Sequence, residues 1–166
     1  MNYAQIRKYD VTNGPGVRTT LFVSGCTHNC KECFNIEQQN FKYGNEWTNT
    51  VEDEFIKYCL NPNVCGVSIL GGEPFQQDIN IMFKLLQRIC NEVQKPIWLW
   101  SGYTYEEIIS NSEKSRLLSF IDVLIDGRFE LDKRDLSLKY RGSENQRVID
   151  IKKTLSTKSV IEIEII

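Results

Sequence analysis

The sequence predicts an α/β protein built on a mostly parallel β-sheet. Apolar, β-branched segments alternate with segments of helical periodicity, and short polar motifs follow the predicted strands. The chain has 166 residues, whereas a closed eight-unit barrel takes about 250. We therefore expect an incomplete, TIM-like parallel β/α barrel of about five or six strands, open on one side.

The first predicted strand covers residues 17–25, "VRTTLFVSG". This segment is rich in β-branched and apolar residues and lies between the turn sequence "NGPG" and a group of cysteines. A helix is expected over residues 48–62, because a polar capping residue precedes acidic residues in its first turn. Asn61-Pro62 then ends this helix.

A second strand and helix follow in the same order. Residues 64–70, "VCGVSIL", have the composition of a buried strand and end at Gly71-Gly72. Residues 78–93 form a predicted helix, because their apolar residues recur at helical spacing. These apolar residues are Met82, Leu85, Leu86, Ile89, Cys90 and Val93.

The third and fourth strands are expected at residues 96–102 and 121–127. Between them, Thr104 and Glu107 form a capping box that begins a helix, and a further short helix is expected around residues 113–119. Four strands separated by helices favour right-handed crossovers, which bring the carboxyl ends of all strands to one edge of the sheet.

The pattern is less regular after residue 128. The segment up to about residue 149 is polar and charged, with a turn at Gly142-Ser143. Residues 160–166, "VIEIEII", alternate apolar and acidic side chains, which predicts a final strand with one solvent-facing side. No internal repeat or second-domain boundary is evident, so we expect a single domain over residues 1–166.

Composition excludes several classes of partner. Twenty basic residues against 22 acidic ones give a net charge of −2, so neither nucleic acid nor an anionic membrane is expected as a partner. The N-terminus has no apolar signal segment, and no apolar run reaches the roughly 18 to 20 residues that cross a bilayer. We therefore expect a cytoplasmic protein.

The chemically distinctive motifs follow the strands. Three cysteines come after the first strand, "GGEP" after the second, "SGY" after the third and "DGRF" after the fourth. Because ligands of parallel α/β folds bind at the carboxyl ends of strands, these motifs predict one shared site at that edge.

Cys26, Cys30 and Cys33 have the spacing C-x3-C-x2-C. A reducing compartment argues against disulfides, and three thiols leave one unpaired. A zinc site would need His28 as its fourth ligand, although structural zinc ligands usually form two separated pairs; a solvent-facing loop position is the simpler interpretation of His28. Thiolates are the normal ligands of iron–sulfur clusters, and three of them leave one iron without a protein ligand.

The other three cysteines lie outside this loop. Cys59 is near the end of a predicted helix, Cys65 opens a strand, and Cys90 lies on the apolar stripe of a helix. We interpret all three as small buried hydrophobic residues, which is the usual role of a free cysteine.

The three-cysteine spacing, followed by Gly-Gly-Glu at the end of a later strand, resembles the radical S-adenosylmethionine (SAM) enzymes. Within that superfamily the chain is similar to the activating proteins of anaerobic ribonucleoside-triphosphate reductase. The motifs that carry this similarity are "NGPGVR", "CTHNCKECFN", "WLWSGY", "DVLIDGRF" and "RGSENQR". They run from residue 13 to 147, so residues 150–166 form a C-terminal tail outside the resemblance.

The resemblance implies a radical SAM domain with one 4Fe-4S cluster, held by Cys26, Cys30 and Cys33, and SAM on the open iron. The reduced cluster would cleave SAM to methionine and a 5′-deoxyadenosyl radical. That radical would take a hydrogen atom from a glycine of the reductase and leave a stored glycyl radical. The implied partners are the glycine loop of the reductase and a low-potential electron donor such as flavodoxin, and a homodimer is left open.

By the same resemblance, Glu32, Cys33 and Phe34 contact the cofactor, with Phe34 covering the adenine side. The chain departs here from the wider superfamily, which usually has an aromatic residue just before the third cysteine. Glu32 holds that position in this chain, and the aromatic residue follows the cysteine.

The later motifs supply the remaining expected contacts. Gly71 and Gly72 have no Cβ and so let the backbone approach the cofactor closely. Glu73 offers a negative charge that suits the methionyl ammonium group. Ser101 and Asp126 are further candidate cofactor contacts, Asp126 toward the ribose or the substrate side.

Other residues of these motifs keep two interpretations each. Gly14, Pro15 and Gly16 either shape a loop near the cluster or form a plain turn before Arg18. Tyr103 is a candidate SAM contact. Trp98 and Trp100 are most simply core residues. Asn145 and Arg147 either bind the cofactor carboxylate or the partner, or belong to a solvated loop.

Three alternatives remain. The chain could activate another glycyl-radical enzyme, such as one of the formate-lyase type, although its short length argues against this. It could act on a small molecule, like a deazapurine synthase. It could also be a non-catalytic iron–sulfur or zinc module, in which case "GGEP" would have no role.

Overall fold

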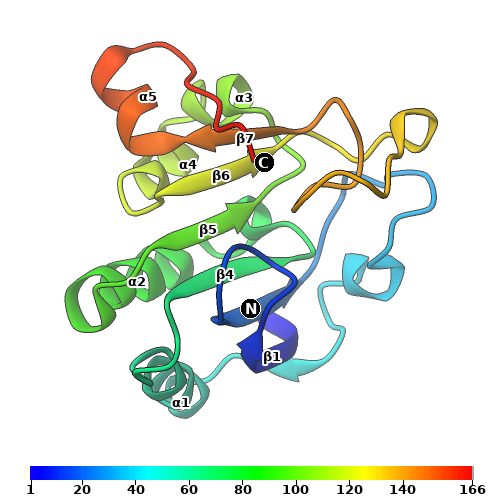
Figure 1. Cartoon of the computed structure of the whole chain (residues 1–166). Helices are drawn as coiled ribbons and strands as arrows, with labels where there is room; N and C mark the ends of the chain where they lie inside the picture. The colour runs from blue at the N-terminus through cyan, green and yellow to red at the C-terminus, as the bar shows by residue number, and fades with distance from the viewer. Residues whose placement is uncertain (166) are drawn as a thin grey trace.

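The computed structural model describes residues 1–165, and within them the strands form one seven-stranded sheet that is not closed (Figure 1). The strand order is β3-β1-β2-β4-β5-β6-β7. Their bounds are β1 (Asn2–Asp10), β2 (Arg18–Ser24), β3 (Asn45–Glu46), β4 (Gly66–Gly71), β5 (Ile97–Trp100), β6 (Val123–Asp126) and β7 (Arg147–Asp150). The mixed α/β class predicted from the sequence is confirmed.

The centre of the sheet is parallel and its flanks are antiparallel. Strands β2, β4, β5 and β6 run in parallel, whereas β1 pairs antiparallel with β2 and β3, and β7 pairs antiparallel with β6. The four predicted strands are the four parallel ones. The expectation of about five or six strands is wrong for residues 1–165, because β1, β3 and β7 add three flanking strands to the four.

The helices begin where the sequence offers a cap. The α-helices are α1 (Asn49–Cys59), α2 (Ile79–Arg88), α3 (Tyr105–Ile109), α4 (Ser112–Leu118) and α5 (Ile151–Thr157). The Thr48 side chain accepts a hydrogen bond from the Val51 amide at the start of α1, and Thr104 and Glu107 form the predicted capping box at α3. Helix α2 continues as the π-helical turn η3 (Ile89–Val93), so the predicted helix over 78–93 is confirmed.

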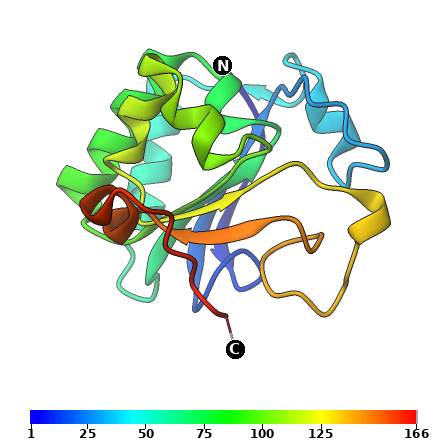
Figure 2. The same ribbon diagram turned by 90° about the horizontal axis from the view of Figure 1, so that it is seen from above.

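The two faces of the sheet are covered differently. Figure 2 shows the helices on one side of the sheet and long loops on the other. The large core lies under the helices and contains Leu21, Ile69 and Leu99. On the loop side, Trp98, Val123, Ile125 and Val148 form a smaller apolar cluster, against which Trp100 and Tyr140 pack. The face of the sheet that carries the smaller apolar cluster is therefore covered by loops and not by helices.

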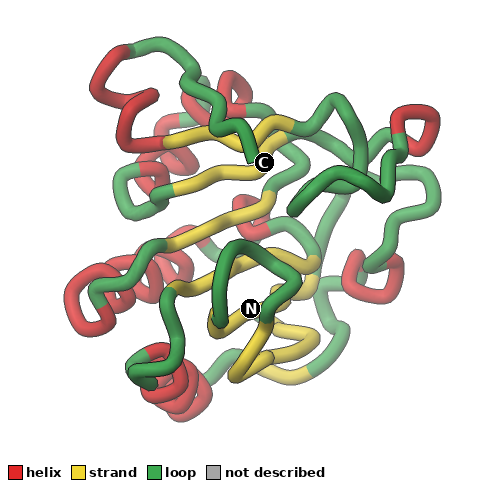
Figure 3. The backbone as a smooth tube through the Cα atoms, in the orientation of Figure 1, coloured by secondary structure: helices red, strands yellow, loops and turns green. Residues whose placement is uncertain are grey.

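These loops gather at the edge where β4, β5 and β6 end (Figure 3). They contain three short 3-10 helices: η1 (Ile36–Gln39), η2 (Pro74–Gln76) and η4 (Leu131–Lys133). The loop between β1 and β2 is fixed by a buried arginine at the start of β2. Arg18 Nε donates to Ser68 Oγ over 2.7 Å, and Ser68 Oγ donates to the Asn13 carbonyl over 2.6 Å. The loop that begins with "NG" is thereby held against β4.

The C-terminal tail lies along β7. Ile163 N donates to the Val148 carbonyl over 2.8 Å, and Ile149 and Glu162 form an isolated antiparallel bridge. Ile163 and Ile165 pack on the loop-side cluster, while Glu162 and Glu164 are exposed, so the predicted alternation is confirmed as far as residue 165. The predicted strand over 160–166 is otherwise wrong, because the pairing extends no further than this bridge; Ile166 lies outside the described residues.

Candidate iron–sulfur and cofactor site

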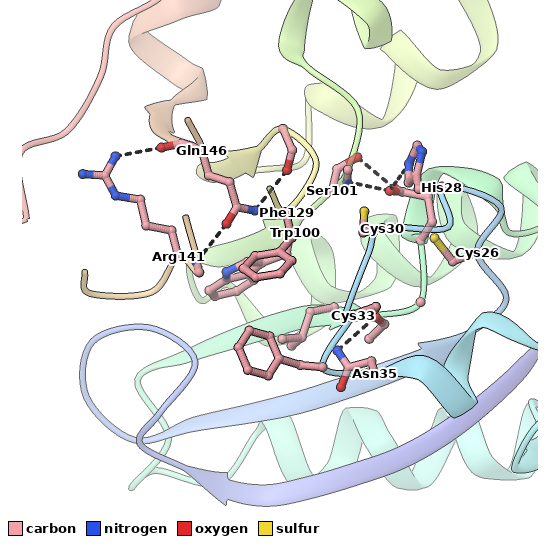
Figure 4. A pocket seen from close by; sticks show the side chains of 18 of the residues that line it. Cys26, His28, Cys30, Cys33, Asn35, Trp100, Ser101, Phe129, Arg141 and Gln146 are labelled. Atoms are coloured by element: carbon pink, nitrogen blue, oxygen red, sulfur yellow. Dashed lines mark hydrogen bonds and ion pairs between the residues drawn. The ribbon is translucent and has the colours of Figure 1, made fainter. Parts of the chain in front are cut away.

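A cavity of about 360 Å³ opens at the carboxyl edge of the parallel strands. Its walls come from the cysteine loop, from the ends of β4 and β5, and from the loops after β6. Figure 4 shows Cys26, Cys30 and His28 on one side of the cavity and Trp100, Arg141 and Gln146 on the other. The predicted convergence of separate motifs on one edge is therefore found in the structure.

The cysteine loop is held by hydrogen bonds at both ends. Gly25 N donates to the Gln38 carbonyl over 2.7 Å, and Cys26 N donates to the Gln39 carbonyl over 3.0 Å. After the last cysteine, Asn35 Nδ2 donates to the Gly71 carbonyl over 3.2 Å. The loop is thus attached to η1 and to the end of β4.

The three loop thiols are free, half-buried and part of the cavity wall. Burial raises the pKa of Cys26 to about 11 and also raises the pKa of Cys30, with the negative charge of Cys33 as a second cause for Cys30. Iron binding must therefore displace thiol protons.

The thiols suit a cluster better than a single ion. Within residues 1–165, no three side chains of His, Cys, Asp or Glu are gathered as one metal ion requires, and a zinc ion needs four ligands around one point. A 4Fe-4S cluster makes a different demand, because each cysteine binds a different iron. Three separated thiols on one cavity wall fit that demand and would leave one iron for another ligand.

Glu73 lies fully buried at the end of β4, where it follows two glycines. Its carboxylate accepts hydrogen bonds from Ser101 Oγ over 2.9 Å and from Gly102 N over 2.7 Å. It also accepts one from Phe75 N over 3.0 Å. The carboxylate therefore joins the end of β4 to the end of β5 and forms part of the cavity wall.

His28 is not solvent-facing in this structure. Its side chain is 6% exposed, its Nε2 lies 2.9 Å from Glu73 Oε2, and its Nδ1 lies 3.2 Å from Arg128 Nε. The interpretation of His28 as a solvent-facing loop residue is wrong, because the loop folds back onto β4 and β5 and takes the ring with it.

Asp126 belongs to a second cavity, of about 370 Å³, which His28 and Cys30 also line. The carboxylate of Asp126 accepts hydrogen bonds from Tyr105 N over 2.6 Å and from Arg147 Nε over 3.0 Å. Arg147 also pairs with Glu106 over 2.7 Å. These contacts attach β7 and α3 to the end of β6.

Most of the site residues expected from the sequence are brought together, and two are not. Those that line the main cavity are Cys26, Cys30, Cys33, Phe34, Gly71, Gly72, Glu73 and Ser101. Glu32 is exposed and Asp126 faces the second cavity, so neither is part of the main cavity wall. Phe34 is 63% exposed and packs against Phe129 at a ring distance of 5.3 Å.

Sequence reasoning missed several residues of the cavity wall. These are Thr12, Asn13, Asn35, Tyr140, Arg141 and Gln146. Asn35 and Gln146 lie inside the motifs "CTHNCKECFN" and "RGSENQR", which was a usable signal. Gln146 Nε2 donates to the Gly127 carbonyl over 3.0 Å and so holds its loop against the end of β6.

The remaining cysteines divide by location. Cys59 is buried in the main core, as predicted, and Cys90 is half-buried beside it. The interpretation of Cys65 as a buried residue is wrong, because it precedes β4 and its exposed thiol faces the Pro15 carbonyl at 3.4 Å.

No helix within residues 1–165 has the length and apolar character that a membrane span requires.

Comparison with known proteins agrees with the geometry. A family described as a 4Fe-4S single cluster domain matches residues 12–149, a range that includes the cysteine loop and the strand ends of the cavity. The anaerobic ribonucleoside-triphosphate reductase-activating protein of Vibrio cholerae is 41% identical over 150 residues, which cover 88% of this chain and 96% of the relative. The protein of the same name from Escherichia coli strain K12 is 41% identical over 152 residues, covering 89% of this chain and 97% of the relative.

A more distant relative carries the same name. The activating protein of Enterobacteria phage T4 is 35% identical over 150 residues, which cover 89% of this chain and 93% of the relative. Identity of this extent holds over nearly the full length of each relative. The chain therefore belongs to the family of anaerobic ribonucleoside-triphosphate reductase-activating proteins, with a 4Fe-4S single cluster domain over most of its length.

Proposed function

We propose that this chain is a radical SAM enzyme that activates an anaerobic ribonucleoside-triphosphate reductase by generating a glycyl radical on it. The observation that carries the proposal is the cavity at the strand ends, where Cys26, Cys30 and Cys33 share a wall with Glu73 and Ser101. Family membership supports the identity of the partner, since the relatives are named for that reductase.

The three loop cysteines would hold a 4Fe-4S cluster, with SAM on the iron that has no protein ligand. When bound, the cluster would supply an electron to the sulfonium of SAM, giving methionine and the radical that removes a hydrogen atom from a glycine of the partner. Burial of the thiols on one wall supports this arrangement, because the surroundings of a cluster set its potential.

The chain's own residues would bind and orient the cofactor. The carboxylate of Glu73 attracts the methionyl ammonium group, and Gly71 and Gly72 let the backbone approach the cofactor. Phe34 would cover the adenine side beside the last cysteine, and Glu32 would contact the cofactor from outside the main cavity wall. Ser101 supports Glu73 through its 2.9 Å hydrogen bond. Asp126, which lines the neighbouring cavity, would face the ribose or the substrate side.

The wider architecture fits a protein substrate. We propose that residues 1–166 form one radical SAM domain with a partial barrel, and that residues 150–166 are an added tail. The cavity lies at the carboxyl edge of a sheet that is not closed, where a glycine loop of the reductase would reach it. A low-potential donor such as flavodoxin would reduce the cluster in the cytoplasm, and a homodimer is compatible with one cluster per chain.

The test is anaerobic activation of the partner. The chain is reconstituted with iron and sulfide, reduced, and mixed with SAM and an anaerobic ribonucleoside-triphosphate reductase; the electron paramagnetic resonance (EPR) spectrum then reports the glycyl radical. We expect the glycyl doublet with the wild-type chain and with Cys65→Ala, whose thiol lies outside the loop. Cys26→Ala should give no doublet, because one iron loses its ligand.

The alternatives predict other outcomes. A doublet on a formate-lyase type enzyme, and none on the ribonucleotide reductase, would identify a different glycyl-radical partner. SAM cleavage that depends on a small molecule and needs no protein partner would indicate a metabolite-modifying enzyme. If the chain binds zinc, or binds a cluster that does not cleave SAM, the protein is a non-catalytic metal-binding module.

A further inference from the structure

His28 is the only histidine of the chain, and both of its ring nitrogens have a partner. Nε2 lies 2.9 Å from Glu73 Oε2, and Nδ1 lies 3.2 Å from Arg128 Nε. The Nε of an arginine can only donate a hydrogen bond, so Nδ1 must accept it. The ring proton is therefore on Nε2, which donates to the carboxylate of Glu73.

The ring is also enclosed by the chain that follows β5. It packs edge-on against Tyr103, with ring centroids 4.6 Å apart and an interplanar angle of 74°. A Cβ on Gly102 would lie 2.4 Å from His28 Cδ2, so a residue with a side chain there would displace the imidazole. The glycine and the aromatic residue of "SGY" thus form a seat for this ring.

The carboxylate of Glu73 has one hydrogen-bond donor from the cysteine loop, and this donor is His28. Glu73 is fully buried, and its other hydrogen-bond donors are two backbone amides and a hydroxyl, which come from Phe75, Gly102 and Ser101. Among these four partners, His28 comes from the cysteine loop, whereas the others belong to the ends of β4 and β5. It therefore transmits the position of the cysteine loop to the carboxylate.

We propose that His28 is a positioning residue that sets the distance between the cluster ligands and Glu73. The inference rests on the proposed function for its effect on SAM, since Glu73 would bind the methionyl ammonium while the cysteines hold the cluster. The cofactor would be held by the cluster and by Glu73, and His28 joins the two parts of the chain that carry them. Loss of the ring would therefore weaken cofactor binding without removing a cluster ligand.

Gln76 offers a matched control, because its side chain links the same parts of the chain without contacting the carboxylate of Glu73. Its Oε1 accepts a hydrogen bond from Thr27 N over 2.8 Å, and its Nε2 donates to Tyr103 Oη over 3.0 Å. Gln76→Ala therefore removes this side-chain link to the cysteine loop but leaves both partners of the His28–Glu73 contact in place. A role for His28 in loop rigidity alone predicts the same effect from both variants.

The first experiment uses the cluster-free protein and needs no activity. With ¹⁵N-labelled histidine, the single imidazole gives one pair of nitrogen signals, and long-range proton–nitrogen correlations identify the protonated nitrogen. We expect the Nε2–H tautomer with an unprotonated Nδ1. An Nδ1–H tautomer, or averaging between the two tautomers, would contradict the contacts with Glu73 and Arg128.

The second experiment measures SAM binding to the reduced cluster by titrating the change in its EPR spectrum, normalised to iron content. We expect His28→Ala to bind SAM about 10- to 100-fold more weakly than the wild type, as is typical when a residue that orients ligands is lost. His28→Gln should restore most of the affinity, because its amide places an N–H near the position of Nε2. Gln76→Ala should bind SAM like the wild type.

The outcomes separate this inference from the proposed function. If the wild-type spectrum responds to SAM and His28→Ala responds with the same affinity, the inference is wrong and the proposed function stands. Equal weakening by His28→Ala and Gln76→Ala, without rescue by His28→Gln, also contradicts it. A wild-type cluster that ignores SAM contradicts the proposed function instead, and the tautomer measurement still decides the contact with Glu73.

Discussion

Gly71 combines two constraints that exclude a side chain at the end of β4. Its φ is +110°, and a Cβ there would lie 2.7 Å from the carbonyl oxygen of Val23 in the neighbouring strand. Gly71→Ala should therefore destabilise the cluster-free protein by about 2 to 4 kcal/mol, which combines backbone strain with a backbone clash. Urea unfolding measures the loss.

Gly127 is the matched control for this prediction. Its φ is +98°, but a Cβ at this position would have its nearest neighbouring atom 3.6 Å away, so only the backbone conformation resists a side chain. Gly127→Ala should cost about 1 to 2 kcal/mol. Equal losses for the two variants would mean that the contact with Val23 does not restrict Gly71.

The carboxylate of Asp10 makes the stability of the fold depend on pH at acidic values. Burial alone would raise its pKa, but hydrogen bonds from Thr12 and Asn13 outweigh burial and lower the pKa to about 2. Because the pKa is about 3.9 in an unfolded chain, the ionised carboxylate contributes about 2 kcal/mol of stability above pH 4. That contribution is lost as the pH falls through 2.

Asp10→Asn tests this linkage. The variant should be less stable than the wild type at pH 7 by up to about 2 kcal/mol, and the difference should shrink between pH 4 and pH 2. Urea unfolding at several pH values measures it. A difference that stays constant down to pH 2 would show that the carboxylate charge is not what holds Thr12 and Asn13, which line the cavity.

Local spacing identified the candidate ligands but not their surroundings. Cys26, Cys30 and Cys33 could be selected from eight residues of sequence. The surroundings of His28 could not be predicted in this way, because its partners Glu73 and Arg128 lie 45 and 100 residues away along the chain. The exposure of Cys65 also depends on a distant loop, since its neighbour is Pro15.

At the scale of elements, caps and apolar periodicity predicted the helices α1 to α4 and the parallel strands. Strand β1 was missed because it pairs with β2 near an edge of the sheet, so few of its side chains are buried and no apolar run marks it. Helix α5 was also missed: it has seven residues, and the sequence "IKKTLST" offers little apolar periodicity.

The tail provides a test at this scale. Ile163 packs against the loop-side cluster that includes Trp98, whereas the neighbouring Glu164 is exposed. Ile163→Ala should lower the free energy of unfolding by about 1 to 2 kcal/mol, since the side chain is half-buried. Glu164→Ala should change it by less than about 0.5 kcal/mol. No loss in Ile163→Ala would mean that the tail does not stabilise the sheet.

In the whole molecule, the two faces of the sheet differ in what covers them. Helices cover one face and bury the large core, and loops lie on the other face (Figure 2). The loops at the strand ends line the cavity. The parallel strands were predictable from alternation along the sequence, and so was the edge that carries the site. The flanking antiparallel strands were not, because they add to the sheet without a crossover helix.

The proposed function requires that three cysteines hold a 4Fe-4S cluster and leave one iron for SAM. The most direct measurement is the Mössbauer spectrum of the chain reconstituted with ⁵⁷Fe, recorded before and after SAM is added. We expect one iron of the four to change its parameters toward higher coordination while the other three stay the same. Four irons that are unaffected by SAM would contradict the claim.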